Sequence, residues 1–100
     1  MVTVVAILNI RDGQSAAFEA AFRQAAPLIA AAPGYIGHEL QKCLDTPRRY
    51  LLLEHWHTRD AHMLGFRQSP GFEEWKRLTH HFYDPFPSVE HYEPFVEYSG

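Results

Sequence analysis

The chain has 100 residues, of which 46% are hydrophobic, 14% aromatic and 21% charged. This composition indicates one folded domain over residues 1–100 and excludes a disordered protein, although so short a chain buries only about two-thirds of its unfolded surface. The formal net charge of -3, without any cluster of basic residues, argues against a nucleic-acid partner.

The cysteine content and the N-terminal segment bear on where the protein works. The chain has one cysteine, Cys43, which cannot form an intramolecular disulfide, and this is typical of a reducing compartment. Residues 1–8 are apolar, but they have no cationic start and are too short to span a bilayer. We therefore predict a cytoplasmic protein without a membrane partner.

The first part of the chain predicts a strand and then a helix. Residues 2–10 are rich in β-branched side chains and apolar on both faces, which is typical of a strand buried on both sides. From Gln14 the apolar period becomes helical, and Pro27 should kink the helix or make it restart before Pro33 and Gly34 end it. The inward stripe of this helix consists of Phe18, Phe22, Ala25 and Ile29.

Two alternating segments predict the next two strands. Residues 35–44 and 50–57 alternate in polarity, and the sequence Asp45-Thr46-Pro47 supplies a turn between them. In the second strand of this pair, one predicted face carries Tyr50, Leu52, Glu54 and Trp56.

The last part of the chain predicts two helices and an edge strand. Thr58 and Ser69 are placed to cap two successive helices, the second strengthened by Pro70 at its first position. Met63 and Phe66 should point inward from the shorter helix. The inward stripe of the second helix consists of Phe72, Trp75, Leu78, Thr79 and Phe82. Residues 89–98 alternate as a last strand, which Pro94 marks as an edge or irregular segment.

The order of elements is therefore βαββααβ, which predicts an α+β fold. Two strand-helix-strand halves joined by a hairpin form a ferredoxin-like antiparallel sheet with its helices on one face. The first and third strands are apolar on both faces, so the side away from the helices also needs a cover. We predict a homodimer in which a second copy packs against this side, forming an α/β barrel.

Several short motifs support this layout. They are Phe18, Pro33-Gly34-Tyr35, Leu53-Glu54-His55-Trp56, Phe66-Arg67-Gln68-Ser69-Pro70 and Glu90-His91-Tyr92-Glu93. With these motifs and this order of elements, the chain resembles the antibiotic biosynthesis monooxygenase family of dimeric α/β barrel proteins. The resemblance covers almost the whole chain, and it is more specific for fold than for substrate.

The resemblance implies a cofactor-independent monooxygenase that acts on a small aromatic or quinol-type substrate with dioxygen. A phenol or enol that loses a proton becomes an electron-rich anion able to reduce dioxygen directly. Such an enzyme needs a base, hydrogen-bond donors and a dry aromatic pocket.

The sequence offers candidates for each of these parts. The catalytic candidates are His38, Asn9, Trp56 and Arg67, with His55 and His80 as other possible bases. The substrate-binding candidates are Phe18, Phe22, Glu54, Phe66, Phe72 and His80.

Each polar candidate has a structural alternative. His38 has apolar neighbours on its strand face, which suits a neutral base with a lowered pKa and equally a buried structural histidine. Glu54 needs a partner, either in an ion pair with Arg67 or Arg77 or as a proton acceptor. Asn9 could contact substrate or cap the end of its strand.

Two further histidines have the spacing most suggestive of a metal-binding site in this sequence. His55 and His57 stand two apart on one strand face and could chelate a metal if a third ligand approached. Hydrogen bonding at a dimer interface or at the sheet rim explains the same pattern, and we predict no metal site.

Two other functions are compatible with the resemblance. One is a dimeric small-ligand-binding or stress-related protein without oxygenase chemistry. The other is haem degradation, which would use Asn9 and His80. For haem the motif is incomplete, because Gly65 or Phe66 stands where a tryptophan is expected and Lys76 lies near the ligand position.

Overall fold

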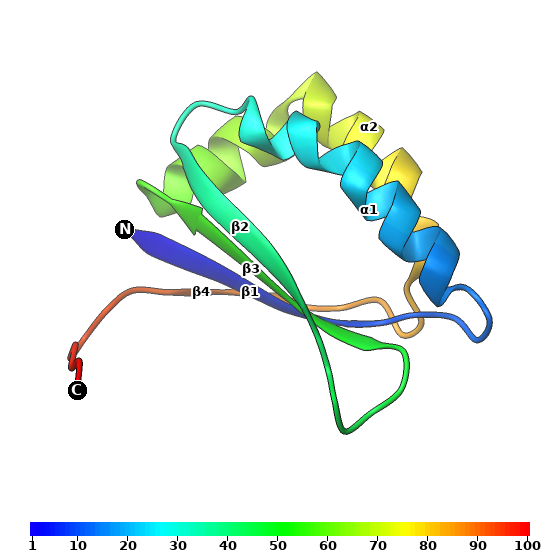
Figure 1. Cartoon of the computed structure of the whole chain (residues 1–100). Coiled ribbons are helices and arrows are strands. Elements are labelled where there is room, and N and C mark those ends of the chain that lie inside the picture. The colour runs from blue at the N-terminus through cyan, green and yellow to red at the C-terminus, as the bar shows by residue number, and fades with distance from the viewer.

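The computed structural model describes all 100 residues and contains a four-stranded antiparallel sheet with two helices on one face (Figure 1). The main elements are β1 (Val2–Asn9), α1 (Ser15–Ala30), β2 (Tyr35–Lys42), β3 (Arg49–Trp56), α2 (Pro70–Thr79) and β4 (Val89–Tyr92). With the short helical segment Ala61–Gln68 between β3 and α2, this order confirms the predicted α+β, ferredoxin-like βαββααβ fold. None of the helices has both the length and the apolar character needed to cross a membrane.

The strands lie in the order β2-β3-β1-β4, so β1 and β3 form the centre of the sheet. Val4 of β1 is opposite Glu54 of β3 on one side and opposite His91 of β4 on the other. Residues in register share a face of the sheet, so these three side chains project toward the same side.

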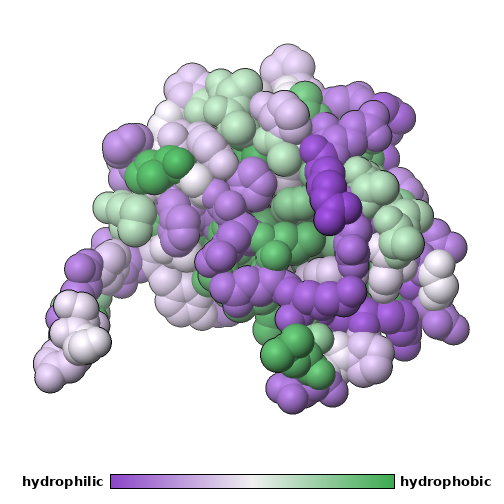
Figure 2. Space-filling model, in the orientation of Figure 1, coloured by the Kyte–Doolittle hydropathy of each residue, from purple (hydrophilic) through white to green (hydrophobic).

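The inner face of the sheet carries the core. Val4, Ala6 and Leu8 of β1 are almost fully buried. The helices contribute Phe18, Phe22, Ala25, Ile29 and Trp75 to the same core. Figure 2 shows apolar side chains between the helical layer and the sheet, framed by polar ones.

The outer face of the sheet has no helix on it (Figure 1). Its central positions are apolar, and Val5, Leu51 and Leu53 are half-buried while Ile7 is 52% exposed. Covering this face with a second copy of the chain stays a prediction.

The sequence predicts that helix α1 kinks or restarts at Pro27. The helix is continuous from Ser15 to Ala30, so it does not restart there. Pro27 lies in the last turn of the helix, where its missing N–H leaves only one carbonyl, that of Arg23, without its usual donor. One lost hydrogen bond near a terminus does not end the helix.

Both predicted N-caps are present. The Ala61 N–H donates to Thr58 Oγ1 at 3.0 Å, and the Phe72 N–H donates to Ser69 Oγ at 3.3 Å. Ser69 stands directly before Pro70, which begins α2.

The segment between the two caps is not the short α-helix that we predict from the sequence. It forms a π-helical turn (Ala61–Gly65) followed by a 3-10 turn (Phe66–Gln68). The chain then enters α2, which ends at Thr79 and tightens into a second 3-10 turn (His80–Phe82). The segment after β3 is therefore a series of short turns with α2 between them.

Strand β4 is shorter than predicted. It lies at the edge of the sheet, as Pro94 suggests, but pairing ends at Tyr92 rather than continuing to residue 98. Proline has no N–H to donate to a sheet, so pairing cannot continue through position 94. Residues 93–100 leave the body of the molecule as a tail (Figure 1).

Gly34 sets the entry into β2 and its contact with the π-helical turn. Its φ is +85°, a left-handed conformation that favours glycine, and an added Cβ would lie 2.6 Å from the Cβ of Ala61. The Gly34 carbonyl also accepts a hydrogen bond from the N–H of His57 at 2.8 Å. The start of β2 is thus tied to the chain that leaves β3.

Candidate active site

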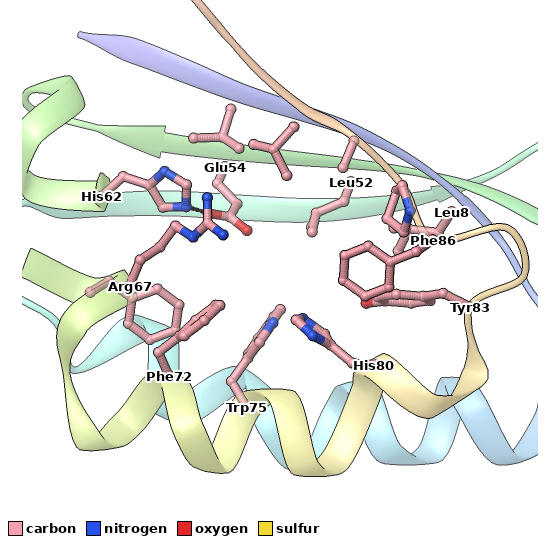
Figure 3. Close-up of a pocket in the computed structure, with 15 residues that line it drawn as sticks. Leu8, Leu52, Glu54, His62, Arg67, Phe72, Trp75, His80, Tyr83 and Phe86 are labelled. Atoms are coloured by element: carbon pink, nitrogen blue, oxygen red, sulfur yellow. Dashed lines mark ion pairs between the residues drawn. The ribbon is translucent and has the colours of Figure 1, made fainter. Parts of the chain in front are cut away.

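A cavity lies between the inner face of the sheet and the segment that runs from the π-helical turn through α2 (Figure 3). Its empty space is about 550 Å³, including the part open to solvent. Most of the lining is apolar and comes from Val4, Ala6, Leu8, Leu52, Phe66, Phe72, Trp75 and Phe86. The polar side chains that line it are Glu54, His62, Arg67, His80 and Tyr83.

Glu54 supplies a carboxyl group to the sheet side of the cavity. Alternation along β3 directs it inward, between Leu52 and Trp56, and the residue is only 4% exposed. Its Oε1 accepts a hydrogen bond from Trp56 Nε1 at 3.0 Å, while Oε2 has no hydrogen-bond partner in the protein. Oε2 is therefore free to bind a molecule in the cavity.

Burial raises the pKa of Glu54 to about 7. The hydrogen bond from Trp56 and the positive charge of Arg67 act in the opposite direction, because both favour the carboxylate. The group can therefore accept or release a proton near neutral pH.

His62 lies beside Glu54, with its Nε2 3.6 Å from Glu54 Oε1 (dashed line in Figure 3). On its other side, Nδ1 is 2.9 Å from Nε2 of His91 in β4. Burial is the main reason that the pKa of His62 falls to about 4, and the charges of His91, Arg67 and Arg59 lower it further. The imidazole is thus neutral at pH 7.

Arg67 brings a positive charge to the same end of the cavity. It extends from the 3-10 turn, and its guanidinium carbon is 5.5 Å from the ring centroid of Phe72. This position favours a negative charge in the cavity and disfavours a second positive charge.

His80 and Tyr83 form the opposite end of the cavity (Figure 3). Burial lowers the pKa of His80 to about 4 and raises that of Tyr83 to about 12, so both are neutral at pH 7. The His80 ring packs against Phe72, Tyr83 and Phe86, and its nitrogens bind no other protein group. It can therefore form a hydrogen bond to a bound molecule.

The cavity brings together five of the residues singled out from the sequence, namely Glu54, Phe66, Arg67, Phe72 and His80. These residues come from β3, the 3-10 turn, α2 and the turn that follows it. Their proximity gives the site a carboxyl group, a cation, a neutral imidazole and two aromatic walls.

Other predicted site residues lie in the core behind the cavity. Trp56 is fully buried; it donates a hydrogen bond to Glu54 and packs against the rings of His62 and Phe66, which line the cavity. Phe18 is also fully buried, and Phe22 packs between His38 and Trp75. None of the three lines the cavity.

His38 and Asn9 lie away from the cavity. His38 stands on the edge strand β2, where its Nδ1 is 2.6 Å from the hydroxyl of Tyr35, and burial lowers its pKa. Asn9 accepts a hydrogen bond from Arg49 Nε at 3.0 Å on the outer face of the sheet. Asn9 and His80, which the haem-degrading alternative combines, are therefore on opposite faces.

The partner predicted for Glu54 also differs in the structure. Arg77 forms its ion pair with Glu74, one turn away on α2, so it is not available to Glu54. The direct neighbours of the Glu54 carboxyl group are Trp56 and His62. Arg67 acts on it through charge and forms no hydrogen bond to it.

Sequence reasoning missed His62 and its contact with His91. The available signal was the spacing of four between His62 and Phe66, which puts both on one side of a helical turn. The pairing of His91 with Val4 across β1 and β4 could not be read from either segment alone.

The titratable side chains of the chain form no cluster of metal ligands. No three His, Cys, Asp or Glu side chains converge closely enough to hold a metal ion. The cavity offers a carboxyl group, a guanidinium group and a neutral imidazole, together with apolar walls, to a small organic molecule.

Comparison with protein families identifies the chain. Residues 1–78 match the model of the family described as antibiotic biosynthesis monooxygenase. The chain belongs to this family. The match includes β1, α1, β2, β3 and most of α2, so it covers the segments that carry Glu54, His62 and Arg67.

Individual relatives are consistent with this assignment. The uncharacterized protein YczJ of Bacillus subtilis is 50% identical over 93 residues, which are 93% of this chain and 98% of that protein. A crystal structure from Bordetella bronchiseptica, assigned to the same family, is 36% identical with a TM-score of 0.90 over 95% of this chain and 97% of its own.

A more distant neighbour has a stated activity. SnoaB from Streptomyces nogalater, described as a cofactor-independent oxygenase, has a TM-score of 0.74 over 98% of this chain and 94% of its own. Its sequence identity is 24%, so this likeness shows the shared fold alone.

Proposed function

We propose that the protein is a cofactor-independent monooxygenase that oxidises a small aromatic or quinol-type substrate with dioxygen. The observation that carries the proposal is the carboxyl group of Glu54, buried in an apolar cavity with one free oxygen and a pKa of about 7. A base is most effective when its pKa lies near the working pH. Family membership and the fold shared with the oxygenase SnoaB support the same proposal.

The proposed reaction begins with proton transfer from a substrate hydroxyl group to Glu54 Oε2. The resulting anion is electron-rich and reduces dioxygen, forming a carbon–oxygen bond, and the peroxide anion takes a proton from solvent to give a hydroperoxide of the substrate. The O–O bond and the C–H bond at the same carbon then break, so that one oxygen atom stays on the product as a carbonyl and the other leaves as water. The substrate supplies all the electrons.

Other cavity residues support this step. Arg67 is placed to stabilise the substrate anion, and the neutral His80 to orient its polar group. Phe66 and Phe72 offer flat apolar walls that exclude water from the reacting centre. Trp56 holds the carboxyl group of Glu54 in place through its N–H. His38 and Asn9 have no part in this mechanism.

The test is oxygenation of a panel of quinols and phenolic polycycles. Substrate and protein are mixed without oxygen, ¹⁸O₂ is admitted, and the product is analysed by mass spectrometry, with one ¹⁸O atom per product expected. Glu54→Gln should reduce kcat on the order of a hundredfold or more, because it removes the base. The matched control Glu39→Gln, which removes an exposed carboxylate from β2, should keep full activity.

One outcome would support the other function predicted from the sequence. If the folded protein binds members of the panel but converts none of them, the oxygenase proposal is wrong and a ligand-binding protein is favoured. Equal activity of Glu54→Gln and wild type would reject Glu54 as the base.

We also propose that the protein works as a homodimer whose subunits meet through the outer face of the sheet. The exposed apolar centre of that face, with Ile7 at 52% exposure, supports this assembly. Sedimentation should give twice the 11.6 kDa of one chain, and Ile7→Glu should shift it toward the monomer. Leu44→Glu, in the exposed β2–β3 turn, is the matched control. A wild-type monomer at micromolar concentration would contradict the proposal.

The cytoplasmic location expected from the sequence stays a prediction.

A further inference from the structure

Three titratable side chains form a line from the cavity to the edge of the sheet. Glu54 borders the cavity, His62 lies next to it, and His91 follows on the edge strand β4. The two gaps are 3.6 Å, from Glu54 Oε1 to His62 Nε2, and 2.9 Å, from His62 Nδ1 to His91 Nε2. His62 thus presents one ring nitrogen to each neighbour.

Burial differs along this line. Glu54 and His62 are each 4% exposed, whereas His91 is only partly buried, and its second ring nitrogen has no protein partner. The line therefore begins in a dry environment and ends at solvent.

The surrounding charges oppose a positive charge on either histidine. Arg67 from the 3-10 turn and Arg59 from the segment before the π-helical turn lower the pKa of both His62 and His91, in addition to burial. Glu54 is the acidic group that faces His62 from β3. Both imidazoles are therefore neutral near pH 7, and each carries its proton on one of its two nitrogens.

The 2.9 Å contact couples the protonation of the two rings. A hydrogen bond between two neutral imidazoles needs one N–H and one unprotonated nitrogen, so the tautomer of His62 determines that of His91. When His62 carries its proton on Nδ1, its Nε2 is open toward Glu54. When it carries the proton on Nε2, that N–H points at the carboxylate.

We propose that His62 and His91 form a proton relay that carries the proton collected by Glu54 out to solvent. This proposal rests on the proposed function in assigning the source of the proton to the substrate. Glu54 is protonated after each substrate deprotonation and must lose that proton before the next turnover. Apart from His62, the protein group in direct polar contact with the Glu54 carboxyl group is Trp56, whose N–H only donates.

The transfer involves one proton at each position. The Glu54 carboxyl group first turns so that its protonated oxygen faces His62. Its O–H bond breaks as an N–H bond forms at His62 Nε2, and the His62 Nδ1–H bond breaks as one forms at His91 Nε2. The proton on His91 Nδ1 passes to water. Both rings end neutral in the opposite tautomer, and Glu54 ends as the carboxylate. The 3.6 Å gap closes by less than an ångström of side-chain movement to reach hydrogen-bond length.

The first test needs no substrate, so it remains decisive even if the protein has no oxygenase activity. In protein labelled with ¹⁵N-histidine, long-range ¹H–¹⁵N correlation spectra identify the protonated nitrogen of each ring. We expect His62 to carry its proton on Nδ1 well below pH 7 and on Nε2 well above it, following Glu54, whose pKa is about 7. His91 should change tautomer over the same pH range.

Glu54→Gln is the decisive variant for this measurement. Without a titrating carboxyl group, His62 and His91 should keep one tautomer across that pH range. A wild-type His62 whose tautomer does not depend on pH, or an unchanged switch in Glu54→Gln, would overturn the relay.

The second test concerns transfer to solvent. His91→Gln keeps a polar side chain beside His62 but cannot pass a proton through an imidazole ring. In weakly buffered solution its turnover should fall roughly a hundredfold, the lower end of what a lost acid–base group costs, and added imidazole should restore it. The matched control His57→Gln removes an exposed histidine and should show neither effect. A loss that imidazole does not restore would indicate a structural role for His91 and reject the relay.

Discussion

The raised pKa of Glu54 predicts a specific dependence of stability on pH. In the folded protein this pKa is about 7, against an ordinary value of 4.5, and burial is the main cause. Between these values the folded state binds a proton that the unfolded state does not bind. The free energy of unfolding therefore falls as the pH rises from 4.5 to 7, because ionisation of the buried group opposes folding.

The size of this effect follows from the same two values. A pKa difference of this size corresponds to about 3 kcal/mol, of which about 2 to 3 kcal/mol is expressed between pH 5 and pH 8. In Glu54→Gln the titrating group is absent. The free energy of unfolding of the variant minus that of wild type should therefore increase by about 2 to 3 kcal/mol from pH 5 to pH 8. Any effect of the substitution that does not depend on pH shifts this difference equally at both ends.

Urea unfolding at constant protein concentration, followed by tryptophan fluorescence, measures this difference. Trp56 and Trp75 are both buried and report on the core. His62, whose lowered pKa weakens the fold as pH falls from 6.5 toward 4, contributes equally to both proteins and cancels to first order. The control Glu39→Gln should follow the wild-type profile. A stability difference between Glu54→Gln and wild type that does not change with pH would refute the reasoning.

Three further substitutions test individual contacts. Trp56→Phe removes the N–H donor that favours the Glu54 carboxylate, so titration of the carboxyl group by infrared spectroscopy should show its pKa raised by roughly one pH unit. Gly34→Ala combines a positive φ with a 2.6 Å approach to the π-helical turn and should cost about 2 kcal/mol or more in urea unfolding. Gly37→Ala, with open space at its Cβ, should be much milder. Ser69→Ala removes the cap of α2 and should cost about 1 kcal/mol in thermal unfolding.

The faces of the strands could be predicted from the sequence because side chains alternate along a strand with a period of two. The inward positions of Leu52, Glu54 and Trp56 follow directly from this rule, and all three are buried. The two N-caps were predictable for a similar reason, since capping depends on residues only three positions apart.

Alternation along a strand does not tell where that strand lies within the sheet. Alternation along the strand made His38 a candidate base, but it does not say that β2 is an edge strand on the side away from the cavity. The contact between His62 and His91 likewise joins residues 29 positions apart and depends on the strand order and on a π-helical turn. The local pattern therefore located Glu54 and could not supply its relay.

Strand β3 serves two surfaces through adjacent residues. Leu52 and Glu54 face the cavity, while Leu51, Leu53 and His55 face the opposite side of the sheet. Substitutions at the even-numbered positions can change which molecule fits the cavity and leave the other surface untouched, and substitutions at the odd-numbered positions can do the reverse. The proposed substrate preference and the proposed self-association could thus diverge independently within one eight-residue segment. A shift of β3 by a single residue would exchange the two sets and abolish both properties together.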